Sequence, residues 1–334
     1  MKRPKPLTSY AQNREDVLLA RAFQPWQKTG FWIDVGAGHP REGSVTALFS
    51  DFGWRGLNIE PLEAEYALLC RDRPNDINVK VAVGSTAGSA VLYAGPPENR
   101  GMSTLVKEYG EALLETGFEK IVVPVVTLEQ LVSEYIHGSV DFLKIDVEGY
   151  EASVLEGVDL RALRPTVIMV EATKPGTSTP SHEVWEPLII RQGYRFALFD
   201  GLNRIYVSEL ADPSFLAALS TPVNVLDEYL LYETRLEIAA GLAATNSQLR
   251  LRDETISELE ERLDRSNAYL VASQRRCADA LEQVEAIAPM LKAIESRPSY
   301  QAVHAVTNRL ARHPWLFRRL RSLVAIFFKY ENAD

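Results

Sequence analysis

The stretch FWIDVGAGHPREGSV, residues 31–45, joins a short apolar run to a turn that contains two glycines. Residues 31–35 are predicted to form a strand, and Gly36 and Gly38 let the backbone of the turn approach a ligand closely. Ser44 can cap a helix that begins near the end of the stretch. A strand that leads through glycines into a helix is typical of nucleotide-cofactor sites in α/β proteins.

The residues around this turn favour S-adenosylmethionine over a dinucleotide. Dinucleotide turns follow the pattern G-x-G-x-x-G, and Arg41 occupies the third glycine position here. Asp34 precedes the first glycine, where a carboxylate suits a cationic amino group better than a phosphate. The next apolar run ends in Glu60, which can accept hydrogen bonds from ribose hydroxyls. Ala82 and Val83, at the end of the third run, are small enough to flank an adenine.

Five short apolar runs alternate with helix-like stretches in the first part of the chain. Because each run is too apolar to expose one face, we expect strands that helices cover on both sides. The alternation predicts a mainly parallel α/β sheet. The runs span residues 31–36, 56–61, 77–84, 140–149 and 165–172.

Two further segments complete the predicted globular domain, residues 1–226. In residues 194–208, two β-rich runs flank Asp200-Gly201, which predicts a closing hairpin and an antiparallel last strand. Residues 85–127 form an insertion with two predicted strands between the third and fourth core strands. We expect it to cover a ligand, as insertions of this kind often do.

Seven stretches of the chain resemble the FkbM family of S-adenosylmethionine-dependent methyltransferases, in the family's order, over about residues 9–227. They are SYAQNREDVLL, FWIDVGAGHP, FGWRGLNIEP, DINVKVAVG, GMSTL, DFLKIDVEGYEASVLEG and RPTVIMVEA. The resemblance implies the class I, Rossmann-like methyltransferase fold, a seven-stranded, mostly parallel sheet with an antiparallel last strand. It also implies O-methylation, often of sugars or polyketide-like products. The cofactor residues implied are Asp34, Gly36, Gly38, Glu60, Ala82 and Val83.

The segment DFLKIDVEGYE carries the strongest candidates for the chemistry. Lys144, Asp146 and Glu148 alternate within one apolar strand, so their side chains share a direction. Asp146 or Glu148 can be a general base, or the pair can help to hold a divalent metal ion. Alternatively, Asp146 contacts the cofactor's amino group and Lys144 neutralises it, or the three form a buried ion pair only. Burying such groups without a purpose is costly, which favours a functional site.

Four more groups are expected near the cofactor. His39 stands where many FkbM members have asparagine, which makes it a candidate for catalysis specific to the acceptor. Ser103 and Thr104, in the insertion, can hydrogen-bond the cofactor's carboxylate or the acceptor. Glu171 ends the fifth run and faces the same rim. The family's N-terminal motif is expected to fold over the cofactor and includes Tyr10, Gln12, Glu15 and Asp16.

Residues 227–288 carry a heptad repeat. Apolar residues recur every seven positions from Leu242, while the d row is weaker because it includes Arg252, Ser266 and Ser273. The pattern predicts a long α-helical coiled coil through which the chain self-associates. A single long helix lying on the globular domain is the alternative. The a row consists of Leu242, Leu249, Ile256, Leu263, Leu270, Cys277 and Val284.

The tail, residues 297–334, is basic. Seven arginines and lysines and no acid lie between Arg297 and Lys329. From His313 onward, aromatic and aliphatic residues alternate with arginines, which predicts an amphipathic helix. Such a helix suits an anionic membrane surface; packing on the acidic domain is the alternative.

Composition limits the class of protein. A net charge of −9 argues against nucleic acid as a partner. Cys70 and Cys277 form neither a disulfide framework nor a metal-binding motif, which suits a reducing cytoplasm. We find no signal peptide and no apolar stretch long enough to span a membrane. A cytoplasmic enzyme, peripheral at the inner membrane face, is therefore expected.

The three parts together predict a function. In arrangement they resemble bacterial enzymes that methylate the growing end of a lipid-linked surface polysaccharide and so limit its length. We expect an O-methyltransferase that caps a sugar hydroxyl of a surface glycan at the membrane. The alternatives are an O-methyltransferase for a small lipid or polyketide product, and a non-catalytic scaffold with a degenerate methyltransferase domain.

Overall fold

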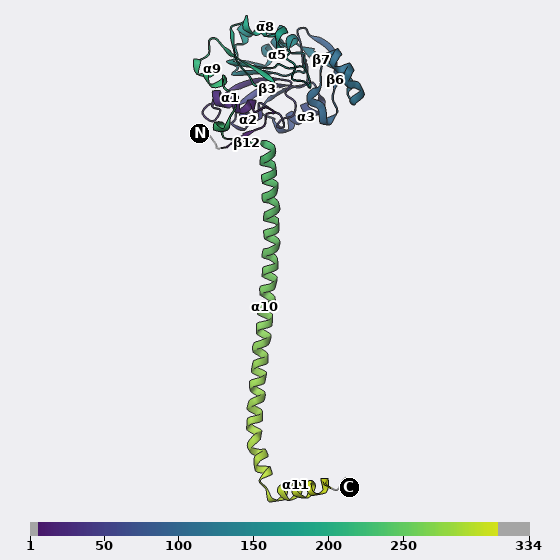
Figure 1. Cartoon of the computed structure of the whole chain (residues 1–334), viewed down its shortest axis with the longest axis vertical. Helices are drawn as coiled ribbons and strands as arrows, with labels where there is room; N and C mark the ends of the chain where they lie inside the picture. The colour runs from purple at the N-terminus through teal and green to yellow at the C-terminus, as the bar shows by residue number, and fades with distance from the viewer. Residues whose placement is uncertain (1–5, 313–334) are drawn as a thin grey trace. The chain divides into compact units, whose positions relative to one another are not determined.

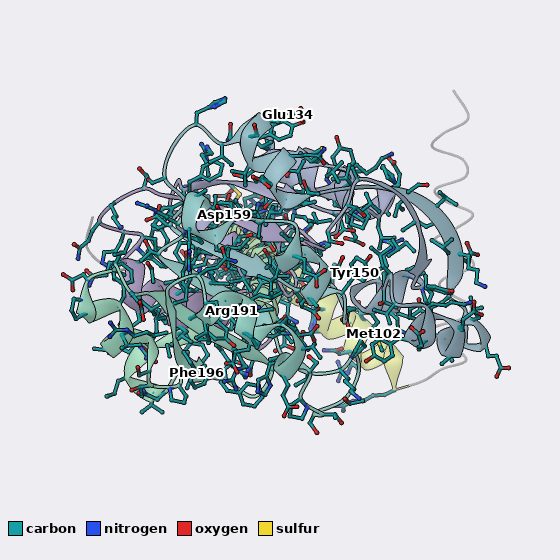
Figure 2. All side chains as sticks on the ribbon, turned by 90° about the horizontal axis from the view of Figure 1, so that it is seen from above. Met102, Glu134, Tyr150, Asp159, Arg191 and Phe196 are labelled. Atoms are coloured by element: carbon teal, nitrogen blue, oxygen red, sulfur yellow. The ribbon has the colours of Figure 1, made fainter. Side chains whose placement is uncertain are left out.

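The computed structural model describes residues 6–312 of the chain (Figure 1). It divides into two compact units, Met1–Gly241 and Leu242–Asp334. The first unit holds three β-sheets, of seven, three and two strands, together with the helices around them. Charged side chains such as Glu134, Asp159 and Arg191 lie on its surface (Figure 2).

The seven-stranded sheet has the strand order β10-β11-β9-β8-β2-β3-β4. Five strands are parallel to their neighbours, and β11 runs antiparallel between β9 and β10. This is the methyltransferase-like α/β fold, with the predicted antiparallel last strand formed by the 194–208 hairpin. The strands are β2 (Phe31–Val35), β3 (Arg55–Ile59), β4 (Ile77–Val79), β8 (Phe142–Ile145), β9 (Val167–Glu171), β10 (Tyr194–Phe199) and β11 (Asn203–Ser208).

Helices cover both faces of this sheet, as the apolar runs predicted. One hydrophobic cluster joins sheet residues such as Trp32 and Phe142 to α1 (Glu15–Phe23), α2 (Ala47–Asp51) and α9 (Pro213–Leu219). The other cluster joins the opposite sheet face to α5 (Leu128–Tyr135), α6 (Glu151–Glu156) and α8 (Glu186–Ile190). The remaining short helices of the unit are α3 (Glu63–Asp72), α7 (Leu160–Leu163), η3 (His182–Val184) and η4 (Val225–Asp227).

The third apolar run, residues 77–84, does not form one strand. It divides into β4 in the main sheet and β5 (Ala82–Val83), which pairs with the insertion. The insertion then adds its two predicted strands, giving the order β5-β7-β6 and a small hydrophobic core of its own. Its elements are β6 (Gly88–Ala94), η1 (Pro97–Met102), α4 (Lys107–Leu113), η2 (Leu114–Thr116) and β7 (Glu119–Val126).

The long helix begins later and ends later than the predicted coiled coil, residues 227–288. Strand β12 (Tyr229–Leu231) comes first and pairs in parallel with β1 (Leu7–Ser9), so this segment belongs to the globular unit. Helix α10 then spans Tyr232–Glu295, about 96 Å at ~1.5 Å per residue, and includes Pro289. The short-range heptad signal could not reveal the long-range pairing of β12 with β1.

The described part of the second unit, residues 242–312, is almost entirely helical. No residue of α10 is buried, and the aliphatic residues of the a row are 48% to 63% exposed. Helix α11 (Pro298–Ala311) follows. The predicted amphipathic segment from residue 313 onward lies outside the described residues. Within residues 6–312, no helix combines the length and apolarity that crossing a bilayer requires.

Candidate active site

The carboxyl ends of β2 and β8 meet at the topological switch point of the sheet. From β2 the chain proceeds to β3 and β4 on one side, and β8 and β9 lie on the other. Ligands of α/β sheets bind at such a point. The sequence candidates Gly36 and Asp146 follow these two strands, and Asp34 pairs with Lys144 in the register.

The close approach of the chain beyond the ends of β2 and β8 requires a glycine at position 36. Its φ is +77°, and a Cβ built on it would lie 1.8 Å from the carbonyl oxygen of Asp146. Gly38 also has a positive φ, +59°, but a Cβ there would meet nothing within 4 Å. The first glycine therefore permits close packing between two strand ends, whereas the second faces open space where a cofactor can approach.

Lys144 connects the glycine turn to the two acids. Its Nζ lies 3.2 Å from Asp34 Oδ1 and 3.4 Å from Asp146 Oδ2, and donates a 2.8 Å hydrogen bond to the Gly36 carbonyl. Burial opposes its charge, but the two carboxylates outweigh this and raise the pKa of Lys144 above its ordinary value. Asp34 is 1% exposed and also accepts a hydrogen bond from Thr46 Oγ1. Both acids are thus partly neutralised by the chain, and a direct bond from Asp34 to the cofactor stays a prediction.

Glu60 holds the glycine turn from the end of β3. It accepts hydrogen bonds from the Gly38 amide at 2.9 Å and the Leu62 amide at 2.8 Å. Burial raises the pKa of its carboxyl to about 7. Its binding of the ribose hydroxyls stays a prediction.

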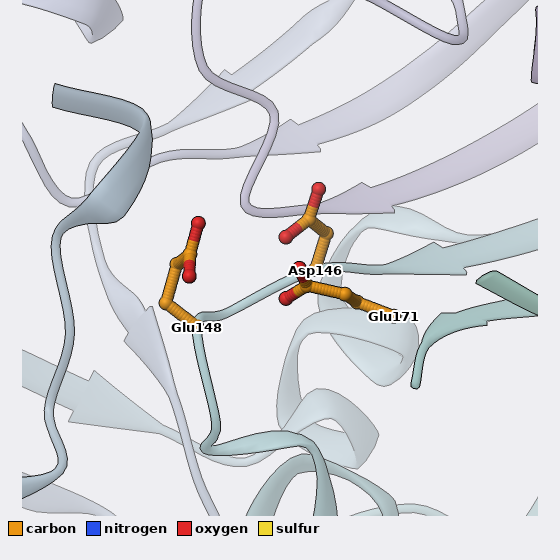
Figure 3. Close-up of side chains that lie close together, drawn as sticks. All are labelled: Asp146, Glu148 and Glu171. Carbon is orange, nitrogen blue, oxygen red and sulfur yellow. The ribbon is translucent and has the colours of Figure 1, made fainter. Parts of the chain in front are cut away.

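Asp146, Glu148 and Glu171 converge beyond the ends of β8 and β9 (Figure 3). One carboxylate oxygen from each lies within 4.8 Å of the others. Burial, together with the neighbouring acids, raises the pKa of Glu148 to about 8 and that of Glu171 to about 11. The structure thus brings two predicted catalytic acids together with Glu171, which the sequence placed only at the same rim.

The loop of residues 146–150, here called the acidic loop, carries Glu148, is strained and is held by the insertion. Glu148 has a φ of +52°, which is costly for a residue with a side chain and is often found at functional sites. Thr104 Oγ1 donates a 2.7 Å hydrogen bond to the Glu148 carbonyl, and Thr104 is fully buried. Gly149, at φ +97°, lies under Tyr109 of α4, whose ring carbon would be 2.7 Å from an added Cβ. The insertion therefore covers the acidic loop.

Two sequence candidates make contacts of another kind. Ser103 Oγ donates to the Arg100 carbonyl and accepts from the Gly95 amide, so it closes a turn of the insertion. Its neighbour Thr104, the other candidate of this pair, contacts the acidic loop instead, and the binding of cofactor or acceptor by either residue stays a prediction. His39 Nδ1 accepts hydrogen bonds from the amides of Arg41 and Glu42. The neutral ring therefore carries its proton on Nε2, and the catalytic role of His39 stays a prediction.

The last two cofactor candidates, Ala82 and Val83, are buried in β5. They lie in the small sheet rather than in the main sheet, and Gly84 follows them beside Tyr150 of the acidic loop. Their contact with an adenine stays a prediction.

The N-terminal motif contributes Glu15 to the rim, and sequence patterns could not predict this position. Asn203, which pairs with Glu171 in the sheet register, donates a 2.8 Å hydrogen bond to Glu15. Burial raises the pKa of Glu15 to about 7. Asp16 is fully buried, and its carboxylate accepts hydrogen bonds from the Tyr10 and Ala11 amides. The motif thus folds against the hairpin side of the rim.

Comparison with known families identifies the domain. Residues 34–196, which include the glycine turn and the acidic cluster, match the methyltransferase FkbM domain. Residues 34–196 are an FkbM methyltransferase domain. This part of the chain is therefore a methyltransferase domain, and the long helix α10 lies outside the match.

Three solved structures are similar to the chain at low identity. An FkbM methyltransferase from Methylobacillus flagellatus KT is 16% identical, with 54% of this chain and 43% of that chain covered and a TM-score of 0.35. Monomeric WbdD is 13% identical, with coverages of 59% and 39% and a TM-score of 0.30. Magnesium protoporphyrin IX methyltransferase (ChlM) from Synechocystis PCC 6803 with bound SAM is 10% identical, with coverages of 59% and 80% and a TM-score of 0.30. The chain spans less than half the length of the first two. No curated protein matches it.

Proposed function

We propose that this methyltransferase transfers the methyl group of S-adenosylmethionine to a sugar hydroxyl of a bacterial surface glycan. The main support is the position of the three acids. Asp146, Glu148 and Glu171 converge at the switch point, next to the glycine turn that faces open space at Gly38. An acceptor hydroxyl between them and the cofactor would meet groups able to take its proton.

The reaction needs little covalent chemistry from the protein. The acceptor oxygen attacks the sulfonium methyl group, an O–C bond forms, and the S–C bond breaks. Its electron pair returns to sulfur, which leaves a neutral thioether. The hydroxyl proton must depart, and Glu148 suits this step because its pKa of about 8 lies near the working pH. Asp146 is the second candidate, since its side chain is 37% exposed.

Substitution of the acids tests this role in the full chain. We expect Asp146→Asn and Glu148→Gln to bind S-adenosylmethionine as the wild type does, because neither removes Glu60 or the glycine turn. Methyl transfer should fall by about 100-fold or more, the usual contribution of a positioned base. Calorimetry would measure cofactor binding. Transfer of a radiolabelled methyl group to polysaccharide from a strain lacking the gene would measure activity.

Glu183→Gln makes the same chemical change at an exposed position and should retain full activity. Wild-type turnover in both acid variants would contradict the proposed role. Absence of cofactor binding in the wild type would support the alternative of a non-catalytic scaffold. Full activity on a diffusible lipid or polyketide after deletion of residues 242–334 would favour a small-molecule O-methyltransferase.

We further propose that α10 self-associates as a parallel coiled coil. Its a row is exposed and apolar, which is unfavourable in water unless another helix covers it. Cys277 occupies an a position and is exposed. Residues at a positions of a parallel, in-register pair face each other closely enough for a disulfide.

Mild oxidation of a Cys70→Ser variant should therefore cross-link two chains through Cys277. Leu263→Asp in the a row should abolish the cross-link and reduce the mass measured by sedimentation equilibrium. Leu251→Asp makes the same change outside the a and d rows, at a residue that is 64% exposed, and should have little effect. A monomeric wild type at micromolar concentration, or equal effects of the two aspartates, would contradict the proposal.

The basic tail is proposed to hold the enzyme at the cytoplasmic face of an anionic membrane. Its arginines and aromatic residues from residue 313 onward suit such a surface. The full chain should co-sediment with phosphatidylglycerol vesicles but not with phosphatidylcholine vesicles. A chain that lacks residues 313–334 should stay in the supernatant. Equal binding by this truncated chain, or no binding by the full chain, would contradict the proposed role of the tail.

A further inference from the structure

We infer that Asp146, Glu148 and Glu171 together bind a divalent cation that prefers oxygen ligands, of the Mg²⁺ or Mn²⁺ type. Their nearest carboxylate oxygens lie within 4.8 Å of one another and point into a common space (Figure 3). Oxygen ligands of such an ion at about 2.1 Å lie about 3 to 4 Å apart. Small side-chain rotations would therefore bring all three carboxylates into coordination.

The buried oxygens of the cluster indicate a missing positive partner. Glu171 is only 9% exposed, and its Oε2 is buried without a hydrogen-bond donor among residues 6–312. Glu148 Oε2 is also buried without a hydrogen-bond partner among these residues. A buried carboxylate oxygen without a partner is costly, and a cation between these side chains would remove the cost.

The chain itself does not supply enough positive charge. Lys144 is the cation nearest to the cluster among the ion pairs of the described residues, and it already pairs with Asp34. It reaches only Asp146, at 3.4 Å. Glu148 and Glu171 have no ion pair with a basic side chain in the part of the chain that the structure describes. Within the described residues, Glu148 and Glu171 therefore lack a basic partner at the rim where the acceptor is expected, and a bound cation would supply one.

The carboxylates come from rigid supports. Asp146 follows β8 directly and is tied to Lys144, and Glu171 is the last residue of β9. Glu148 lies on the strained loop that Thr104 fastens to the insertion. A site whose ligands are preset in this way loses little side-chain freedom on binding an ion.

The use of the ion in catalysis rests on the proposed function. Three protein oxygens leave about three positions of an octahedral ion for water or acceptor. A divalent cation there would supply Lewis-acid chemistry that eases loss of the acceptor's hydroxyl proton. An acceptor with two neighbouring hydroxyls, as many sugars have, is the substrate class that such positions fit.

The test is titration of the full chain with Mn²⁺, without cofactor or acceptor, followed by electron paramagnetic resonance of the free ion. We expect one site per chain. Asp146→Asn and Glu171→Gln should each weaken the binding at least tenfold, while Glu183→Gln should bind as the wild type does. Far-ultraviolet circular dichroism would verify that the variants fold, and Glu171→Gln should fold readily because glutamine has the same size and is uncharged at every pH.

Absence of Mn²⁺ binding by the folded wild type at millimolar concentration would overturn the inference. So would wild-type affinity in both cluster variants. Methyl transfer that persists without Mn²⁺ binding would refute the ion site and leave the proposed function intact. Mn²⁺ binding as described, combined with turnover unaffected by a chelator, would establish the site and refute its use in catalysis.

Discussion

Gly36→Ala is expected to destabilise the globular unit by more than about 4 kcal/mol, whereas Gly38→Ala should cost only about 1 kcal/mol. Both glycines have positive φ, so an alanine is strained at either position. Only at Gly36 would the new Cβ also meet backbone, 1.8 Å from the Asp146 carbonyl oxygen. Relief of that overlap would require β2 and β8 to separate.

Urea denaturation followed by circular dichroism would measure the two costs on matched substitutions. Gly38→Ala should also weaken the binding of S-adenosylmethionine, because the added methyl group occupies space at the face of the turn. Calorimetry on the folded Gly38→Ala protein would detect that loss separately from stability. Equal stability of the two variants would contradict the close approach of Gly36 to the Asp146 carbonyl.

Lys144→Met is expected to destabilise the unit by about 3 to 5 kcal/mol, the usual cost of leaving a buried charge without its partner. Asp34 is 1% exposed and, among residues 6–312, would keep only the Thr46 hydroxyl as a partner. The carbonyl of Gly36 would lose its bond from Nζ as well. We therefore expect the glycine turn to loosen together with the fold.

A second substitution distinguishes charge from packing. Asp34→Asn combined with Lys144→Met removes both charges and should recover much of the lost stability. Lys80→Met breaks an ion pair with Glu63 in which both side chains are exposed, so it should cost less than about 1 kcal/mol. Denaturation midpoints would measure all three variants. A Lys144→Met protein as stable as Lys80→Met would contradict the assignment of a buried, necessary cation.

Local sequence patterns predicted most of the fold. The apolar runs indicated strands buried on both faces, and the Asp200-Gly201 turn indicated the antiparallel hairpin, because these signals depend on neighbouring residues only. The same patterns failed at residues 77–84 and near residue 227. There, pairing with the distant strands β7 and β1 decided the outcome, and such pairing leaves no mark in a short window of sequence.

The sequence by itself indicated candidates for cofactor binding and chemistry, since an acid, two glycines and a second acidic segment occur at the ends of apolar strands. Only the tertiary structure decided which of these residues meet in space. It placed Lys144 between Asp34 and Asp146, and it joined Glu171 to the acidic loop across two neighbouring strands. The physical reason is that burial, charge pairing and the approach of two backbones are properties of contacts in space, which spacing along the chain does not specify.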